Sequence, residues 1–203
     1  MKDEMDILKE VGSIAAAHGS TALSEMLGRK INLSVPNLSI TSSSEIEGKI
    51  TSNGAATIVL QTNILTGLKK ESLYVIMDEK NAYRLVDICC KSDELKGSAF
   101  AEMAMSLIKE IGNVVISAYI GALGHFLKKV IIPSLPVMIN APFQEIVKLI
   151  SSSSEQGSLM LIESTFEEPK SAIKGQIWLI LTSVTVEEIK ETCKKTLKDY
   201  NSL

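Results

Sequence analysis

The sequence predicts an α+β fold built from two similar halves, in which two long helices pack side by side over one mostly antiparallel sheet. Three observations support this prediction. Residues 2–27 and 98–126 show helical periodicity, each is followed by strand-like alternation, and the same order of elements recurs about 100 residues later. We therefore expect two α-β-β-β-α units related by a pseudo-twofold axis.

The composition indicates a globular protein with an aliphatic core. The 203 residues are 45% hydrophobic but only 4% aromatic, and the formal net charge is −3. No cluster of Lys or Arg suggests a nucleic-acid partner, no Cys-x-x-Cys pair suggests a metal, and no apolar signal segment opens the chain. We expect a single cytoplasmic domain over residues 1–203, with an internal repeat of 1–96 and 97–203.

The first half begins with the helix expected over residues 2–27. Gly28 predicts its end, because glycine suits a left-handed cap, and the two cations that follow suit a helix C-terminus. A strand is expected over 31–35, closed by Pro36. A polar connection is then expected over 41–53. After it we expect a strand over 56–61, a turn over 65–70 and a second strand over 71–77. A short helix over 80–90 ends the half.

The second half begins with the helix expected over residues 98–126, which would be roughly 40 Å long at about 1.5 Å per residue. The stretch 111–127 is apolar, but Asn113 and His125 interrupt it, so we do not expect a membrane span. One side of the helix carries a polar stripe formed by Glu102, Ser106, Lys109, Asn113 and Ser117. Strands are then expected over 131–136, 158–163 and 176–181, with a closing helix over 186–198.

The repeat is visible residue by residue. Lys-Glu-Val-Gly at 9–12 aligns with Lys-Glu-Ile-Gly at 109–112, and the alignment continues without a gap from there to Pro36 and Pro136. Towards the end of each half the offset rises from 100 to about 104. A shared motif and a shared closing proline at one offset favour duplication over chance similarity of two helix-strand units.

Two residue pairs are candidates for chemistry. Glu110 and Asn113 are three residues apart, so they are neighbours on a helix surface and both polar heads can reach one target. The equivalent pair in the first half is Glu10 and Ser13. A serine hydroxyl is shorter than a carboxamide and cannot span the same distance.

Other candidates are weaker. His18 and His125 lie at non-equivalent helix positions, and no Asp and Ser residues are spaced to form a catalytic group with either of them. We therefore expect neither a catalytic triad nor a metal site. The serine run 151–154 fits a solvated loop.

The two helices resemble the CheC/CheX/FliY family of chemotaxis phosphatases. The motif of that family is Glu-x-x-Asn, usually as E-[IV]-G-N-I, and in the first copy it is followed by G-A-G-N-A-A-T-A-L-S. The second helix reads EIGNVVISAYIGALGHFL and matches this pattern well. The first reads EVGSIAAAHGSTALSEMLGRKINLSVP and matches in frame. The resemblance implies a stand-alone CheC-like or CheX-like protein that hydrolyses the aspartyl phosphate of a CheY-like response regulator.

The resemblance also implies roles for the candidate residues. Asn113 would orient the attacking water, and Glu110 would contact the active-site lysine of the regulator. No cofactor of its own is implied, because the regulator is expected to hold the Mg²⁺. Ser13 replaces the family's Asn, and residues 15–18 also depart from the family pattern, so we expect Glu10 and Ser13 to form a degenerate, inactive site.

Two functions of different classes stay open at this stage. One is a phosphatase that works through the second helix, which the intact Glu110–Asn113 pair favours. The other is a non-catalytic adaptor that binds a response regulator or a CheD-like receptor deamidase, which the altered first copy favours.

Overall fold

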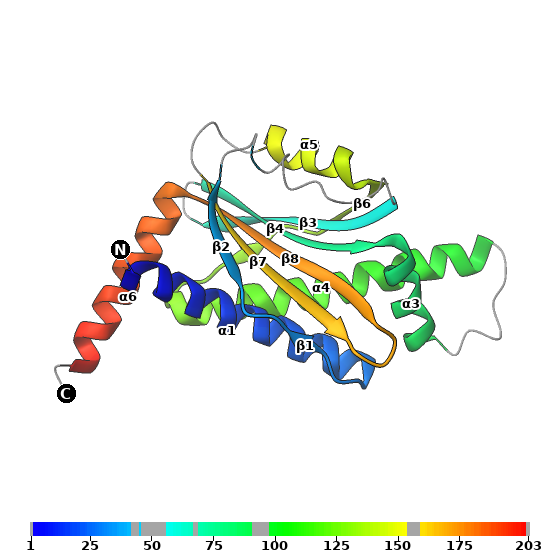
Figure 1. Cartoon of the computed structure of the whole chain (residues 1–203), viewed down its shortest axis with the longest axis horizontal. Coiled ribbons are helices and arrows are strands. Elements are labelled where there is room, and N and C mark those ends of the chain that lie inside the picture. The colour runs from blue at the N-terminus through cyan, green and yellow to red at the C-terminus, as the bar shows by residue number, and fades with distance from the viewer. Residues whose placement is uncertain are drawn as a thin grey trace.

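One antiparallel sheet runs through both halves of the chain in the computed structural model (Figure 1). The structure describes residues 2–41, 45, 56–66, 69–90, 98–153 and 159–201. Its elements are α1 (Lys2–Leu27), β1 (Asn32–Leu33), β2 (Asn37–Thr41), β3 (Ala56–Thr66), β4 (Lys69–Asp78), α3 (Glu79–Cys89), α4 (Ser98–Leu127), β5 (Ile132–Pro133), β6 (Val137–Pro142), α5 (Phe143–Ser153), β7 (Leu159–Glu168), β8 (Ile173–Thr182) and α6 (Ser183–Asn201).

The eight strands follow the order β1-β7-β8-β4-β3-β5, with β2 also paired to β7 and β6 also paired to β3. Every pairing is antiparallel. The two halves meet at the centre, where β4 pairs with β8 and Tyr74 lies opposite Trp178. The predicted α+β class and antiparallel sheet are confirmed.

The strand register repeats the internal symmetry of the sequence. In one half of the sheet Asn37 lies opposite Glu163, and in the other Val137 lies opposite Gln61. Position 37 is therefore equivalent to 137, an offset of 100 residues, and position 61 is equivalent to 163, an offset of 102. The central pair of β4 and β8 joins positions 104 residues apart, 74 and 178. The offset between equivalent residues therefore rises from 100 to 104 along the chain, and the strand pairs at all of these positions are related by the same pseudo-twofold axis.

The halves exchange their edge strands. β1 and β2, which follow α1, pair with β7 of the second half, and β5 and β6, which follow α4, pair with β3 of the first. Equivalent serines fasten both exchanges: Ser34 N donates to Thr165 O at 2.8 Å, and Ser134 N donates to Asn63 O at 2.9 Å. Each half thus completes its share of the sheet only with strands of the other.

The two long helices α1 and α4 lie side by side on one face of the sheet, as predicted (Figure 1). They approach closely at Gly19, where an added Cβ would lie 3.3 Å from the Val115 carbonyl oxygen. The larger core fills the space between these helices and the sheet. The opposite face carries α5, which buries Ile146, Val147 and Ile150 in a second, smaller core.

The strand expectations around the two prolines were wrong in one respect. Pro36 does not close a strand over 31–35; the chain makes the two-residue strand β1, passes the proline and continues as β2. Leu33 lies opposite Phe166 and Asn37 lies opposite Glu163. The edge strand therefore advances by four residues where β7 advances by three. This extra residue is a bulge, and proline is tolerated there because the position makes no ladder hydrogen bond.

Several other expectations about element limits were also corrected. No broad turn occupies 65–70, since β3 continues to Thr66 and β4 begins at Lys69. The helix α5 was not foreseen, and it includes part of the serine run expected as a solvated loop: Ser151 is helical and buried. Most of the polar connection expected over 41–53 lies outside the described residues. The helices expected over 2–27 and 80–90 are confirmed within one residue, and β7, β8 and α6 are longer than expected.

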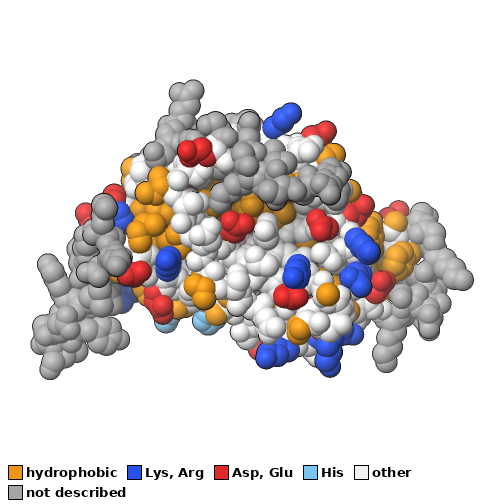
Figure 2. Space-filling model, viewed as in Figure 1, with side chains coloured by type: hydrophobic (Ala, Val, Ile, Leu, Met, Phe, Trp, Pro, Cys, Tyr) orange, Lys and Arg blue, Asp and Glu red, His pale blue; other side chains and the backbone are white. Residues whose placement is uncertain are grey.

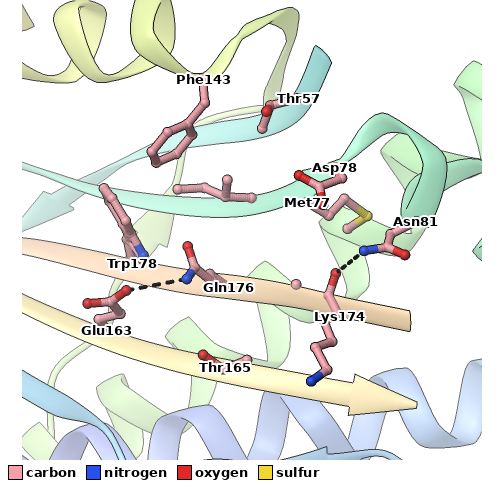
Figure 3. A pocket seen from close by; sticks show the side chains of 12 residues that line it. Thr57, Met77, Asp78, Asn81, Phe143, Glu163, Thr165, Lys174, Gln176 and Trp178 are labelled. Carbon is pink, nitrogen blue, oxygen red and sulfur yellow. Dashed lines mark hydrogen bonds between the residues drawn. The ribbon is translucent and has the colours of Figure 1, made fainter. Parts of the chain in front are cut away.

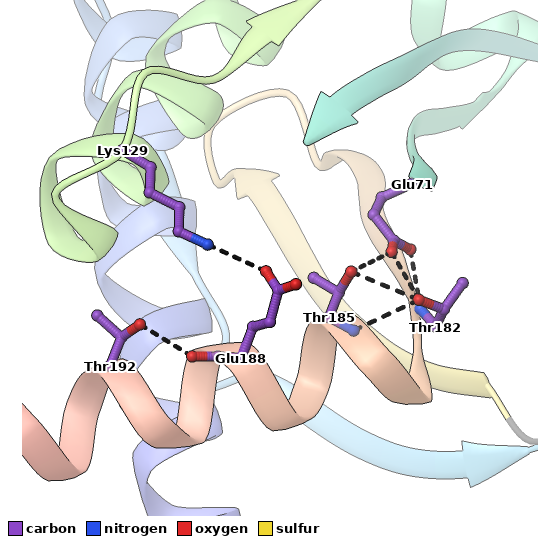
Figure 4. A network of polar contacts seen from close by, with 6 residues as sticks. All are labelled: Glu71, Lys129, Thr182, Thr185, Glu188 and Thr192. Atoms are coloured by element: carbon purple, nitrogen blue, oxygen red, sulfur yellow. Dashed lines mark hydrogen bonds and ion pairs between the residues drawn. The ribbon is translucent and has the colours of Figure 1, made fainter. Parts of the chain in front are cut away.

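A buried carboxylate anchors the last helix to the sheet (Figure 4). Glu71 on β4 is 2% exposed and accepts hydrogen bonds from the backbone N–H and the hydroxyl of Thr182, both at 2.8 Å. The Thr185 hydroxyl donates to the same carboxylate. Further along α6, Glu188 forms an ion pair of 3.0 Å with Lys129, which follows α4. These contacts fix the position of α6 against the end of α4.

A second carboxylate holds the end of α1. Glu168 accepts hydrogen bonds from the backbone N–H groups of Ser171 (2.7 Å) and Lys170 (3.2 Å), and Arg29 lies 3.6 Å away. Burial by itself would raise the pKa of Glu168, but the bonds from Ser171 and Lys170 and the charge of Arg29 together lower it below its usual value. The carboxylate is therefore held in its charged form where α1 ends.

The described cysteines are structural. Cys89 and Cys90 are free, half-buried and packed against the larger core. Burial, and secondarily the neighbouring Cys90, raises the pKa of the Cys89 thiol, which disfavours a reactive thiolate.

The two long helices end with the same backbone turn but different residues. Gly28 has φ 60° after α1, as predicted, whereas its equivalent after α4 is Lys128 with φ 51°. A side chain in the left-handed region is strained, and glycine is not.

We predict that Lys128→Gly raises the free energy of unfolding by up to about 1 kcal/mol, because it relieves this strain at an exposed position. The matched change Gly28→Ala should lower it by a similar amount. Urea unfolding of both variants measures the difference, and a Lys128→Gly protein less stable than the parent would contradict the prediction.

Candidate functional site

The helix α4 separates an inward apolar face from an outward polar one. Ile108, Ile111 and Val115 are buried against the core, and burial raises the pKa of Tyr119 on the same face, so its phenol stays neutral. The members of the predicted polar stripe are all exposed: Glu102, Ser106, Lys109, Asn113 and Ser117. The long apolar helix therefore presents a continuous polar surface to solvent.

Glu110 and Asn113 lie on this outward face, and both side chains are exposed, as predicted. Within the part of the chain that the structure describes, neither side chain has a recorded hydrogen bond or ion pair. A carboxylate and a carboxamide one helical turn apart are thus presented together, with their polar atoms available to a partner.

The glycine between them fixes how the pair is presented. Gly112 faces the sheet, and a Cβ there would lie 2.3 Å from Leu60 Cδ1 on β3. Gly12 repeats the arrangement on α1, at 2.8 Å from Ile162 Cγ2 on β7. Each glycine lets the backbone of its helix pack against a strand side chain, so Glu110 and Asn113 project from a helix that lies close to the sheet.

The equivalent pair on α1 differs in both reach and exposure. Glu10 is exposed, but Ser13 is only partly so. The structure does not bring the two pairs together, because α1 and α4 run in opposite directions (Figure 1). His18 and Ala118 occupy equivalent positions in the two helices, and both line one pocket where the helices cross. Ser13 and Asn113 each lie five residues from that point, on opposite sides, so they are separated by roughly 15 Å along the helices.

A shallow pocket of about 480 Å³ lies between the helices on the side of the first pair. It is lined by Ile14, His18, Ala118, Gly121, Ala122, His125 and Phe126. Sequence analysis did not find this pocket. The sequence feature that could have indicated the pocket is the pair of small residues Gly121 and Ala122 on α4. At the position equivalent to Gly121, α1 carries the larger Thr21.

The two histidines line this pocket from different helices, without a carboxylate among the lining residues. Over the described ranges, no group of three or more His, Cys, Asp or Glu side chains is arranged to hold a metal ion. The surface in Figure 2 also shows acidic and basic side chains interspersed rather than gathered into a single charged patch.

By length and composition alone, α4 from Phe100 to Leu127 could cross a membrane, a test that core helices also pass. In this structure its apolar side packs on α1 and the sheet.

Comparison with known proteins agrees with this geometry. The model of the CheC-like family matches residues 4–40, which span most of α1, β1 and most of β2. The CheY-P phosphatase CheC of Bacillus subtilis is 29% identical over 140 residues, 66% of this chain and 65% of that protein, so the match spans just under two thirds of that relative. The chain is therefore similar in sequence to CheC proteins. A putative CheY-P phosphatase, CheC1 of Halobacterium salinarum, is 22% identical over 84% of this chain and 88% of its own length.

Solved structures of CheC-like fold cover nearly the whole chain. Thermotoga maritima FliY superposes with a TM-score of 0.75 at 20% identity, over 96% of this chain and 98% of that one. A chain of the CheX–CheY–BeF₃–Mg²⁺ complex from Borrelia burgdorferi superposes with a TM-score of 0.55 at 16% identity, over 85% of this chain and 97% of that one. The resemblance inferred from the two helices is confirmed as a similarity in sequence to CheC proteins and a similarity in fold to these structures.

We predict that Gly112→Ala destabilises this CheC-like chain by about 1–3 kcal/mol, since the fully buried Leu60 side chain would have to shift to admit the new methyl group. Gly121→Ala on the same helix meets no atom within 4 Å and should instead stabilise it by up to about 1 kcal/mol through helix propensity. Chemical unfolding of both variants checks the contrast. Equal effects of the two changes would show that the close approach of α4 to β3 does not constrain the helix.

Proposed function

We propose that this CheC-like chain is a cytoplasmic phosphatase of a phosphorylated CheY-like response regulator. The observation that carries the proposal is the exposed Glu110–Asn113 pair, which has no recorded partner among the described residues and projects from a helix fixed on the sheet. Two relatives named CheY-P phosphatase and a structural neighbour from a CheX–CheY complex support the class of partner.

In the proposed complex, Glu110 and Asn113 on the exposed face of α4 lie over the phosphorylation site of the regulator. An acyl phosphate is hydrolysed when water attacks phosphorus in line with the departing carboxylate. The carboxamide of Asn113 can accept a hydrogen bond from that water and donate another, so it holds the nucleophile in position without taking its proton. Positioning of this kind lowers the barrier because the orientation of the water is set before the reaction.

Glu110 has a different proposed task. Its carboxylate is one helical turn from Asn113 and would form a charge-assisted contact with the active-site lysine of the regulator. That contact would fix the register of α4 on the regulator and so place Asn113 over the phosphorus. The Mg²⁺ that balances the phosphoryl charge is proposed to belong to the regulator, and this chain contributes no ligand to it.

A second candidate is a non-catalytic adaptor, which the first pair favours. Ser13 is short and partly buried, so the α1 surface would bind a regulator, if at all, without positioning water. A CheD-like deamidase is an alternative partner for such an adaptor. The two functions are separated by measuring phosphate release from a phosphorylated CheY-like domain with and without this protein: acceleration supports the phosphatase, and binding without acceleration supports the adaptor.

We predict that Asn113→Ala slows dephosphorylation by on the order of 10²-fold or more, while affinity for the phosphorylated regulator stays near that of the parent. The reason is that the interaction is used only when water is being positioned. Single-turnover decay and a separate binding titration measure the two quantities. Ser117→Ala, one turn further along the same exposed stripe, is the matched control and should leave both unchanged.

Glu110→Ala should weaken affinity as well as rate, because it removes a contact that holds the docked regulator. Neither variant should unfold the protein, since both side chains are exposed. A folded Asn113→Ala protein that binds the regulator and still accelerates decay at the parental rate would refute the proposed mechanism.

We predict that Glu10→Ala keeps most of the phosphatase activity, because Ser13 beside it cannot reach as far as an asparagine. The same decay assay, run beside Glu110→Ala, measures this. A loss from Glu10→Ala as large as that from Glu110→Ala would show that the first pair is active.

A further inference from the structure

We infer that the sheet edge formed by β5 and β6 is a self-association surface, through which two copies of this chain form a symmetric dimer. The edge carries an apolar strip of four exposed side chains: Val130 (89% exposed), Ile132 (62%), Leu135 (89%) and Val137 (60%). Single exposed apolar side chains are normal on a protein surface, but several together mark an interaction site. The inference goes beyond the proposed phosphatase and does not depend on it.

The strand register shows that the strip is continuous. Ile132 lies opposite Leu65 and Val137 lies opposite Gln61, and these two positions of β3 are four residues apart. Side chains alternate between the faces of a sheet, so Ile132 and Val137 project from the same face. Leu135 lies between them, in the bulge that separates β5 from β6. The whole strip is roughly 20 Å long.

The strip lies on the face of the sheet away from the proposed catalytic helix. Val59 is two residues before Gln61, so it shares the face of Val137, and it is buried in the smaller core beneath α5. Helix α4, which carries Glu110 and Asn113, covers the opposite face (Figure 1). A dimer formed through the strip therefore leaves both of these side chains open to solvent.

The duplicated half provides an internal control for this surface. The positions equivalent to the strip are 30, 32, 35 and 37, and all four are also exposed. They hold Lys30, Asn32, Val35 and Asn37, so three of them are polar where the second half is apolar. The same backbone thus accepts polar residues at these positions, and folding alone does not explain the apolar side chains of the strip.

The sheet beside the other edge is polar as well. Asn37 on β2 lies opposite Glu163 on β7. Glu163, Lys174 and Gln176 line a pocket of about 330 Å³ on this side of the sheet (Figure 3). At its base is the buried Trp178, whose indole nitrogen is enclosed without a hydrogen-bond partner among the described residues. On the face that the two edges share, the β1–β2 edge is therefore polar and the β5–β6 edge apolar.

This difference between the edges favours a second copy as the occupant of the strip. An apolar strip is complementary to itself, and a twofold axis brings the same surface of two chains together. A head-to-tail contact would instead place the strip against Lys30, Asn32 and Asn37. Contact through side chains is favoured over a continuous sheet, because β5 has two residues and Pro133 and Pro136 offer no N–H.

The area of the strip sets the expected strength of the dimer. The exposed fractions amount to about three full side chains, or roughly 300 Å² of apolar surface per copy. A stable interface buries roughly 800 Å² per partner, polar and apolar surface together. The strip can therefore form the apolar centre of a small interface. Lys129 beside it is paired with Glu188 at 3.0 Å, which reduces the charge repulsion between copies.

Sedimentation velocity of the full chain over a range of concentrations tests the inference. We expect a reversible dimer with a dissociation constant on the order of 10–100 µM, as suits an interface of this size. The mean mass should rise from one chain to two as the concentration passes from about tenfold below this range to about tenfold above it. Sodium sulfate should strengthen the dimer, because the contact is apolar.

Leu135→Asn should weaken the dimer by about tenfold or more, because it places a polar side chain in the centre of the strip. Val35→Asn makes the matched change at the equivalent position of the other edge and should leave the dissociation constant unchanged. A triple variant, Val130→Lys with Ile132→Asn and Val137→Asn, carries the residues of the first half. It should stay folded, as measured by urea unfolding, and be monomeric throughout the concentration range.

Three results would overturn the inference. One is a parent protein that stays monomeric at every concentration, which would assign the strip to a different partner. Another is a folded triple variant that dimerises as strongly as the parent, and the third is an equal effect of Leu135→Asn and Val35→Asn. Phosphate release per chain is expected to be the same for the parent and the triple variant. A failure here is therefore distinguishable from a failure of the proposed phosphatase.

Discussion

The exchange of edge strands between the two halves is the constraint on which the rest of this structure depends. Because β1 and β2 pair with β7, and β5 and β6 pair with β3, each long helix is connected to a strand that belongs to the other half's side of the sheet. The helices are thereby drawn across the shared face, where Gly12 and Gly112 set their distance from it. The outward position of Glu110 and Asn113 follows from that arrangement.

The backbone kept its symmetry while the side chains diverged. Equivalent serines at 34 and 134 make the same backbone contacts, and equivalent glycines make the same close approaches. In contrast, the buried Glu71 that binds α6 has Gly175 at the position 104 residues later, where an added Cβ would meet the ring of Phe166. At these equivalent positions the first half therefore uses Glu71 to anchor α6, and the second half uses Gly175 to pack against Phe166.

The sequence predicted the fold because its strongest signals are local or repeated. The helical periodicity of 2–27 and 98–126, the alignment at offset 100 and the cap at Gly28 all correspond to observed features. The exposure of Glu110 and Asn113 was predictable for the same reason. Helix α5 was missed because its apolar spacing lies next to serines that read as a loop, and the bulge at Pro36 was missed because it exists only relative to β7.

The pockets could not be predicted because each draws residues from elements far apart in the sequence. The groove between α1 and α4 joins Ile14 to Phe126, and the pocket on the opposite face joins Thr57 to Trp178. Single side chains there look ordinary in the sequence. The unpartnered indole of Trp178 becomes visible only when the strands around it are in register.

The bulges at the two prolines also bear on how the molecule behaves in a concentrated solution. The outer strands expose apolar side chains, among them Ile40 at 67% and Val137 at 60%, and an uninterrupted edge of this kind would recruit further strands. Here each edge is divided into a two-residue piece and a piece of five or six residues, with a proline that offers no N–H between them. The ends of the sheet are therefore poor templates for fibril growth, although they are not masked by charge.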